Sequence, residues 1–394
     1  MAKQNKPAIR FKGFTDAWEQ RKVGELIEDY IEKTTVQNQY PVLTSSQQQG
    51  VVFQEDYFAD RQVTTNDNIG YYVLPYGYFT YRSRSDTDVF IFNRNNIIDK
   101  GIISYYYPVF LPKDCDSNFL LRRLNHGIKK QLSMAAEGTG QKVLAHNKFK
   151  NMIVDVPEIE EQQKIGLYFE SLDHLITLHQ RKYDKLQVLK KAMLEKMFPK
   201  NGSSVPEIRF KGFTDAWEQR KLGEIATFIN GRAYSQPELL SSGKYKVLRV
   251  GNFYTNDSWY YSDLELGEKY YADYGDLLYT WSATFGPHIW LGDRVIYHYH
   301  IWKINLSDQL EKQFAVQLLE QDRTNILSSK NGSTMVHITK EGMEQKDVII
   351  PPSTKEQQEI GAFFLQLDNL ITLHQRELEK LKNLKKACLE KMFV

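Results

Sequence analysis

Two blocks of sequence occur twice in this chain of 394 residues, and they constrain its fold more than any other feature. Ile9–Lys22 and Ile208–Lys221 are the same fourteen residues, IRFKGFTDAWEQRK. Glu161–Phe198 and Glu356–Phe393 match at 26 of 38 positions without a gap. The stretches between these blocks have similar lengths but match poorly. The chain is therefore two copies of one plan, in which a constant frame surrounds two variable inserts.

The composition is that of a folded chain. Hydrophobic residues make up 41% and aromatic residues 13%, which is enough for packed cores. The two cysteines, Cys115 and Cys388, match no metal-binding spacing and indicate a reducing compartment. The first residues have no apolar signal region, and no run of eighteen apolar residues occurs. We expect a cytoplasmic protein with no membrane contact.

Bulk charge does not indicate a polyanionic partner. The formal net charge is +2. Val23–Pro157 carries 14 basic and 15 acidic residues, and Leu222–Pro352 carries 12 and 16. Nucleic-acid binding would therefore depend on local basic patches within the inserts.

Both inserts show the same order of predicted elements. Aromatic and β-branched runs punctuated by Gly, Pro and Asn predict strands, and apolar residues at helical spacing predict one helix near the end of each insert. The first insert is expected to contain strands at Gly50–Gln54, Ile69–Leu74, Tyr78–Arg82, Ile102–Phe110 and Met152–Val156, and a helix at Asn118–Ala136. The second is expected to contain strands at Tyr245–Val250, Asp276–Trp281, His288–Leu291, Val295–Ile304 and Val348–Ile350, and a helix at Gln309–Leu327.

The repeated opener has its own predicted features. Thr15 is a candidate helix N-cap, and Trp18 and Leu26 are candidate buried anchors.

The second repeated block predicts one long helix in each half. Its apolar positions alternate mostly between spacings of three and four, as in a coiled coil. A helix of this length spans roughly 57 Å and needs a partner, which is most simply the other copy in an antiparallel pair. We expect pairing through Leu172, Ile176, His179, Leu186, Leu367, Ile371, His374 and Leu381. His179 and His374 would then lie near a pseudo-twofold axis, unless they only fill polar seam positions.

The predicted fold class is α+β, with two similar domains joined by two long antiparallel coiled-coil helices. The corresponding segments are a constant segment at 1–22, a first domain at 23–157, a long helix at 158–198, a linker with the repeated constant segment at 199–221, a second domain at 222–352 and a second long helix at 353–394.

The sequence contains no complete catalytic motif, and we expect neither a catalytic residue nor a bound metal. Glu344 and Lys346 have the Glu-x-Lys form of a nuclease motif, with Asp322 upstream. His298 and His300, with His288 nearby, could ligate a metal if they clustered, but we expect them to be alternate residues on one strand face.

Residues suited to nucleic-acid recognition are present in both inserts. Arginine forks match guanine edges, Asn and Gln amides match adenine, and lysines and hydroxyl groups contact phosphates. The candidate DNA-contacting residues are Arg82, Ser83, Arg84, Thr139, Gln141, Lys142, Asn230, Arg232, Trp281, Lys330, Ser333, Thr334 and Lys340, with Arg122 and Arg123 as further basic residues.

The constant blocks resemble the specificity subunit of type I restriction–modification systems. The opener RFKGFTDAWEQRK and the helix pattern EQQ-x-IG…LD-x-LITLHQR…LKK…LEKMF carry the resemblance. In the second insert, the segments Asn230–Arg232, Tyr274–Leu278 and Gly332–Thr334 are similar to motifs of the family's target-recognition domains. The first insert keeps only Tyr76-Gly77 and Gly138-Thr139.

The resemblance implies that each insert reads one half of a bipartite site in double-stranded DNA. It also implies that the long helices fix the spacer and dock two methyltransferase subunits. Those partners would bind S-adenosylmethionine and methylate adenine N6, and motor–nuclease (restriction) subunits would join them. The chain itself would bind no cofactor and catalyse nothing.

Two other functions remain open from the residues alone. The chain could be a coiled-coil adaptor whose inserts bind proteins. It could also be a nuclease that uses Asp322, Glu344 and Lys346.

Overall fold

The computed structural model describes residues 6–58, 67–200, 202–254, 256–282, 284–328 and 338–393. The chain divides into two compact units, and each is described by itself. Unit 1 comprises the described residues of Met1–His179 and Glu377–Val394, and unit 2 comprises those of Gln180–Arg376. Each unit therefore contains part of both long helices, α6 (Ile159–Lys196) and α10 (Thr354–Met392).

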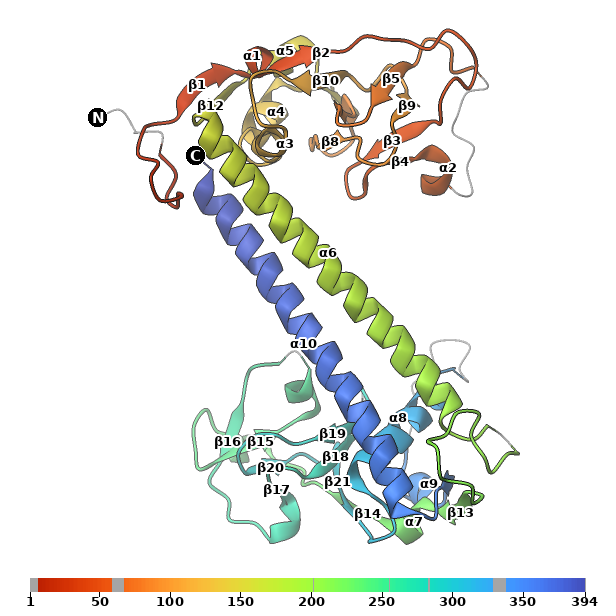
Figure 1. The fold of residues 1–394 in the computed structure, drawn as a ribbon. Coiled ribbons are helices and arrows are strands. Elements are labelled where there is room, and N and C mark those ends of the chain that lie inside the picture. Colours follow the sequence, from red (N-terminus) through yellow and green to blue (C-terminus); the bar gives the residue numbers. More distant parts are fainter. Residues whose placement is uncertain are drawn as a thin grey trace. The chain divides into compact units, whose positions relative to one another are not determined.

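Unit 1 contains short strands and helices ahead of α6 (Figure 1). In chain order they are β1 (Glu19–Lys22), α1 (Val23–Leu26), β2 (Ile27–Asp29), β3 (Leu43–Ser46), β4 (Gly50–Phe53), α2 (Gln54–Tyr57), β5 (Tyr72–Pro75), β6 (Phe79–Tyr81), β7 (Arg84–Ser85), β8 (Phe92–Arg94), β9 (Lys100–Ile103), β10 (Val109–Pro112), α3 (Ser117–His126), α4 (Lys129–Ala135), β11 (Lys142–Val143), α5 (His146–Lys150) and β12 (Ile153–Val156).

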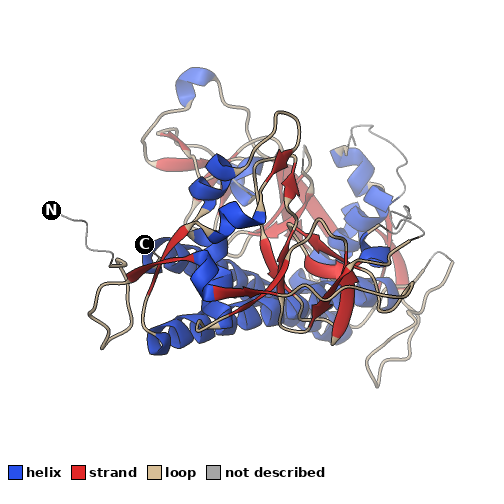
Figure 2. Cartoon of the chain, turned by 90° about the horizontal axis from the view of Figure 1, so that it is seen from above, coloured by secondary structure: helices blue, strands red, loops and turns tan. Residues whose placement is uncertain are grey.

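Unit 2 follows a similar order after the second half of α6. Its elements are β13 (Glu218–Lys221), α7 (Leu222–Ile225), β14 (Ala226–Asn230), η1 (Gln236–Glu238), β15 (Tyr245–Leu248), η2 (Val250–Phe253), β16 (Tyr260–Ser262), η3 (Glu268–Tyr270), β17 (Tyr271–Ala272), β18 (Leu277–Thr280), β19 (Gly286–Ile289), β20 (Val295–Tyr297), β21 (Ile301–Leu306), α8 (Lys312–Ser328), α9 (Lys340–Glu344) and β22 (Asp347–Ile350). Helices and strands are separated by colour in Figure 2.

Each unit has its own central four-stranded sheet, built to the same plan. Its strand order is β2-β10-β6-β8 in unit 1 and β14-β21-β18-β19 in unit 2, and every pairing in these sheets is antiparallel. A second antiparallel pair joins the opener to the end of each insert, as β1-β12 and as β13-β22. The α+β class and the common topology predicted from the sequence are confirmed. The outer strands differ, because unit 2 has a four-stranded sheet β16-β15-β20-β17 where unit 1 has separate strand pairs.

Within each unit the two long helices run antiparallel. In unit 1, Asp173 forms an ion pair with Lys385 at 2.5 Å, and Tyr168 Oη lies 3.5 Å from Cys388 Sγ. In unit 2, Lys190 forms an ion pair with Asp368 at 2.5 Å. Asp173 and Asp368 occupy the same position of the repeated block, as do Lys385 and Lys190. Both units therefore use the same helix register.

The predicted pairing residues divide between the two units. Leu172 and Leu381 belong to the hydrophobic core of unit 1, and Leu186 and Leu367 belong to that of unit 2. Ile371 is buried, while Ile176, His179 and His374 are half-buried. His179 belongs to unit 1 and His374 to unit 2, so the expectation that both lie near one axis stays a prediction.

The repeated blocks hold each insert through buried polar groups. Arg10 makes a two-pronged contact with Glu161, at 2.6 and 2.7 Å, and Arg209 repeats it with Glu356 at 2.7 and 2.8 Å. Both glutamates are fully buried. Trp18 and Leu26, the predicted anchors of the opener, are also buried.

The next residue of each long helix contacts the insert itself. Gln162 donates to the carbonyl of Pro157 at 2.8 Å and accepts from the N–H of Asp116 at 3.0 Å. Gln357 donates to the carbonyls of Pro351 and Gln309 and accepts from the N–H of Glu311 at 2.8 Å. Every one of these contacts is to a main-chain atom.

Several predicted elements are wrong in extent. The predicted strand Ile102–Phe110 is two strands, β9 and β10, because the chain turns at residues 104–108. The predicted strand Val295–Ile304 is likewise divided into β20 and β21 by the turn at 298–300. The predicted helix Asn118–Ala136 is two helices, α3 and α4, and the break falls at Gly127. No helix begins at Thr15, whose hydroxyl contacts only Asp16 among the described residues.

Candidate nucleic-acid interface

A cleft of about 890 Å³ in unit 1 brings together three of the predicted contact residues. Arg82, Arg84 and Gln141 all line it, although Gln141 is far from the other two in the sequence. The remaining wall is polar and aromatic, with Thr44–Gln48, Tyr105–Tyr107 and Asp86 among its residues. The cleft therefore presents hydrogen-bond donors, hydrogen-bond acceptors and the faces of aromatic rings.

Short strand pairing fixes the arginine side of this cleft. β7 pairs with β11, so that Ser85 lies opposite Lys142 and Arg84 opposite Val143. The guanidinium of Arg84 lies over the ring of Tyr106, at 4.0 Å from its centroid. Stacking on an aromatic ring orients a guanidinium and leaves its edge available for hydrogen bonds.

The other predicted residues of unit 1 lie on the same segment as Arg84 or on the segment that pairs with it. The hydroxyl of Ser83 donates to the carbonyl of Tyr106 at 2.7 Å, so Ser83 holds the strand rather than facing a ligand. Gln141 donates to Asp86 at 3.0 Å, and Arg82 lies 4.0 Å from the same carboxylate. Thr139 is exposed in the turn before Gln141, and Lys142 is half-buried.

Two further basic residues do not belong to this surface. Arg123 is buried and lies 3.1 Å from Asp155, and Arg122 forms an ion pair with Asp173 of α6. Burial contradicts a recognition role for Arg123, whereas the role of the partly exposed Arg122 stays a prediction.

In unit 2 the segment Asn230–Arg232 meets the turn at 298–300. The N–H of Arg232 donates to the carbonyl of Tyr297 at 3.1 Å, and the N–H of Tyr299 donates to the carbonyl of Arg232 at 3.1 Å. A Cβ at Gly231 would lie 2.4 Å from the carbonyl oxygen of His298, so only glycine allows this approach. Asn230 is exposed at the end of β14.

The guanidinium of Arg232 is held from one side. It donates to Glu238 at 2.6 Å and lies 5.1 Å from the Tyr234 ring centroid. The hydrogen bond from Arg232, together with bonds from Ser235, lowers the pKa of Glu238 to about 2. Nη1 of Arg232 is buried and has no hydrogen-bond partner among the described residues. The Glu238 carboxylate therefore keeps the Arg232 guanidinium oriented, while the Nη1 group of that guanidinium still has hydrogen bonds to donate.

Trp281 completes an aromatic cluster beside Arg232. Its Nε1 donates to the carbonyl of Tyr299 at 2.9 Å, and its ring lies 5.0 Å from that of His300 and 5.8 Å from that of Trp302. Burial, with His300 and Arg249 nearby, lowers the pKa of His298 to about 4. His298 is therefore neutral at pH 7, and the cluster offers ring faces and neutral polar groups.

Of the remaining predicted residues of unit 2, only Lys340 is described by the structure. Lys330, Ser333 and Thr334 lie outside the described residues. Lys340 begins α9 and lies 3.5 Å from Glu344 of the same helix.

Two residues of the nuclease alternative contact each other, and the third pairs within its own helix. Lys346 forms an ion pair with Asp322, and Glu344 pairs with Lys340. His288 stacks on Phe253 at 4.1 Å, in contact with Tyr254, rather than joining His298 and His300. Over the part of the chain that the structure describes, no group of three His, Cys, Asp or Glu residues could hold a metal ion.

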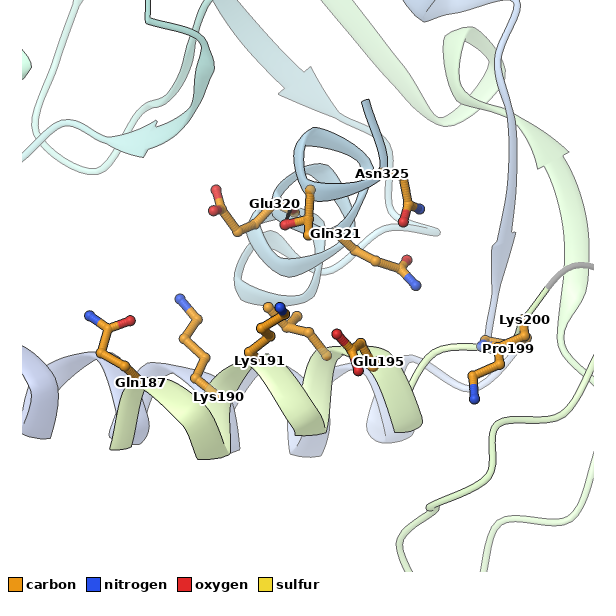
Figure 3. Close-up of a pocket in the computed structure, with 11 residues that line it drawn as sticks. Gln187, Lys190, Lys191, Glu195, Pro199, Lys200, Glu320, Gln321 and Asn325 are labelled. Carbon is orange, nitrogen blue, oxygen red and sulfur yellow. Dashed lines mark hydrogen bonds between the residues drawn. The ribbon is translucent and has the colours of Figure 1, made fainter. Parts of the chain in front are cut away.

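A second cleft, of about 630 Å³, lies on the constant helix in unit 2 (Figure 3). Lys190, Lys191 and Glu195 project from α6 toward Glu320 and Gln321 of α8. Charges of both signs line it, and Lys190 is also paired with Asp368. None of the predicted DNA-contacting residues is among those that line it.

Sequence reasoning missed one wall of the unit 1 cleft. Gln47 and Gln48 lie there, at the tip of the β3–β4 hairpin. The available signal was the run of three glutamines just before the predicted strand Gly50–Gln54. Among the described residues, no helix is both long enough and apolar enough to span a membrane.

Comparisons with known proteins agree with this architecture. A family model described as "Type I restriction modification DNA specificity domain" matches residues 15–188 and again residues 214–383. The chain is 24% identical over 276 residues to the type I restriction enzyme MjaVIII specificity subunit of Methanocaldococcus jannaschii, and 23% identical over 282 residues to the putative MjaX specificity subunit of that organism. These matches cover 65% and 68% of this chain and span 64% and 65% of the two relatives.

Solved structures support the fold. The S subunit of a type I restriction–modification system from M. genitalium superposes with a TM-score of 0.63 at 12% identity, over 99% of both chains. A chain from a structure on complex assembly and conformational transition of the type I system superposes with a TM-score of 0.51 at 17% identity, over 95% of this chain and 97% of that one.

Proposed function

The chain belongs to the family of type I restriction–modification specificity subunits, and we propose that each of its units reads one half of a bipartite DNA site. The observation that supports this proposal is that the same frame holds two inserts whose candidate surfaces differ. The β1-β12 and β13-β22 pairs and the Arg–Glu contacts are the same in both units. The side chains that the two inserts present come from different segments of each insert.

The two candidate surfaces arrange arginine, amide and aromatic groups differently. Unit 1 presents Arg82, Arg84 and the Gln141 amide, while unit 2 presents Asn230, Arg232 and the ring cluster at Trp281. Arginine matches the guanine edge and amides match adenine. Because the two surfaces arrange these groups differently, each would select its own half-site.

The chain's role in this proposal is recognition without catalysis. The long helices set the distance between the half-sites and dock two methyltransferase subunits, which bind S-adenosylmethionine and methylate adenine N6. Restriction subunits, which act as motor and nuclease, complete the assembly, and this chain binds no cofactor. Because both inserts carry more acidic than basic residues, the partners supply part of the contact with phosphates.

Exchange of one insert tests the proposal. Replacing Leu222–Pro352 by the corresponding insert of another family member should change one half-site and leave the other half-site and the spacer unchanged. The methylated sequence is read by long-read modification mapping in cells that contain the methyltransferase subunits. A change in both half-sites would contradict independent reading. Specific capture of proteins, with no bipartite DNA motif, would favour the adaptor function instead.

A further inference from the structure

A turn of three glutamines forms part of the wall of the unit 1 cleft. β3 and β4 lie side by side in antiparallel register, with Ser46 opposite Gly50, so residues 47–49 form the loop between them (Figure 1). All three glutamine side chains are exposed. Gln47 and Gln48 line the same cleft as Arg84. Two adjacent amides thus face the space that the arginine also faces.

Buried groups fix the backbone of this turn. The hydroxyl oxygen of Ser46 accepts from the N–H groups of Gln48 and Gln49, each at 3.2 Å. The side-chain amide of Asn93 donates to Ser45 Oγ at 2.8 Å and to the carbonyl of Ser46 at 2.9 Å. Gly50 has φ of +78°, the left-handed geometry that closes a three-residue hairpin loop. A turn held in this way loses little conformational entropy when its side chains bind a ligand.

Polar contacts also connect the turn to the predicted contact residues. Gln47 donates to the carbonyl of Val89 at 3.0 Å. Three residues earlier, Asp86 accepts from Gln141 and lies near Arg82. The side chain of Gln48, by contrast, makes no hydrogen bond to any residue that the structure describes. Of the two amides that line the cleft, Gln48 is therefore the one whose donor and acceptor are both available.

The chemistry of Gln48 indicates its ligand. A carboxamide carries a donor and an acceptor side by side, which match N6 and N7 on the major-groove edge of adenine. We propose that Gln48 is a specificity-determining residue that reads an adenine in the half-site bound by unit 1. This inference rests on the proposed function of the inserts. It assigns a base to a residue that neither the family's motifs nor the periodicity of the sequence indicates.

The test uses the full chain together with the methyltransferase subunits of its own system. Methylated adenines are mapped across the genome for the wild type, Gln48→Ala, Gln48→Arg and the control Gln20→Ala, whose exposed side chain lies on β1 outside the cleft. Gln48→Ala should lower discrimination at one adenine of one half-site by roughly tenfold or more. Gln48→Arg should shift the preference at that position toward guanine, and Gln20→Ala should leave the motif unchanged.

Each outcome bears on the inference. If the wild type yields a bipartite motif that all three variants keep, the role of Gln48 is wrong while the proposed function stands. If Gln48 variants alter methyltransferase binding but not the motif, the cleft is a protein-binding site and the inference fails. If the wild type itself yields no bipartite motif, the proposed function fails and the role of Gln48 fails with it. Thermal unfolding of each variant identifies loss of fold, and a base change in Gln48→Arg cannot come from unfolding.

Discussion

Arg10 and Glu161 show how single residues of the repeated blocks stabilise the frame. The guanidinium and the carboxylate meet with two short hydrogen bonds, and the carboxylate is fully buried. The hydrogen bond to Glu161 raises the pKa of Arg10, so the contact favours the charged guanidinium. A buried charge without its partner is strongly destabilising, which makes this contact more important than the surface ion pairs.

Glu161→Gln should lower the free energy of unfolding by about 3 kcal/mol, because it leaves the half-enclosed guanidinium of Arg10 without a counter-charge. The matched control is Glu160→Gln, which removes an exposed carboxylate one residue away and should change stability by less than about 0.5 kcal/mol. Urea denaturation of both variants measures the difference. Equal midpoints for the two would show that the contact is only a surface ion pair.

His288 predicts a pH dependence in unit 2. Burial, with Arg323 nearby, lowers its pKa to about 4, whereas the unfolded chain has the ordinary value near 6.5. The unfolded state therefore binds more protons between these values, and stability is lost as the pH falls from 6.5 toward 4. At pH 5 the loss amounts to at most ~2 kcal/mol. His288→Gln should flatten this slope in thermal unfolding between pH 7 and 5, while the exposed His174→Gln should not. Parallel slopes for wild type and His288→Gln would refute the assignment.

Individual contact residues were only partly predictable. Arg82, Arg84 and Gln141 were recognised by residue type, and the structure places them in one cleft. Arg122 and Arg123 have the same chemistry, but side chains on α3 face the core and α6, which residue type cannot reveal. Gln48 was missed because a turn residue has no periodicity.

At the scale of elements, the repeated block predicted the long helices almost to the residue. Their apolar seam is continuous, so local sequence suffices to define them. The insert elements were harder, because tertiary pairing decides where a strand ends. β9 and β10 form one apolar run in the sequence, but they pair with β5 and with β2 and β6 respectively. The short strands β7 and β11 carry too few residues for any pattern.

The ion pair between α6 and α10 in unit 2 should fix their register. Reversing either charge, in Lys190→Asp or Asp368→Lys, places like charges together across a half-buried contact, whereas the double variant restores attraction. Each single variant should lose about 1 kcal/mol, and the double variant should recover most of it. A double-mutant cycle on the urea midpoint measures the coupling. Strictly additive effects would mean that the apolar seam alone sets the register.

At the scale of the whole chain, the sequence predicted two copies of one frame, and both family-model matches and both units agree with it. Which bases are read could not be predicted, because the unit 1 cleft is assembled from segments far apart in its insert. The same frame therefore carries two surfaces, and the base preference of each unit has to be determined separately.

The proposed spacer function predicts the effect of lengthening both helices. Inserting one helical turn at matching positions of α6 and α10 adds about 5.4 Å of helix in each. The spacer between half-sites should lengthen while both half-sites remain the same, as shown by methylation mapping. A control insertion of the same length in the linker at 199–207 should leave the spacer unchanged. Altered half-sites in the helix variant would count against the helices as the determinant of spacing.

Gln162 and Gln357 have a consequence for how such a protein can change over generations. Their amides hold the inserts through carbonyl and N–H groups that every amino acid possesses. Substitutions elsewhere in an insert therefore leave its attachment intact, and an unrelated segment with the same backbone course could be accepted at the same place. Substitutions can accumulate at the ligand-facing positions of an insert without compensating mutations in the helices that hold it.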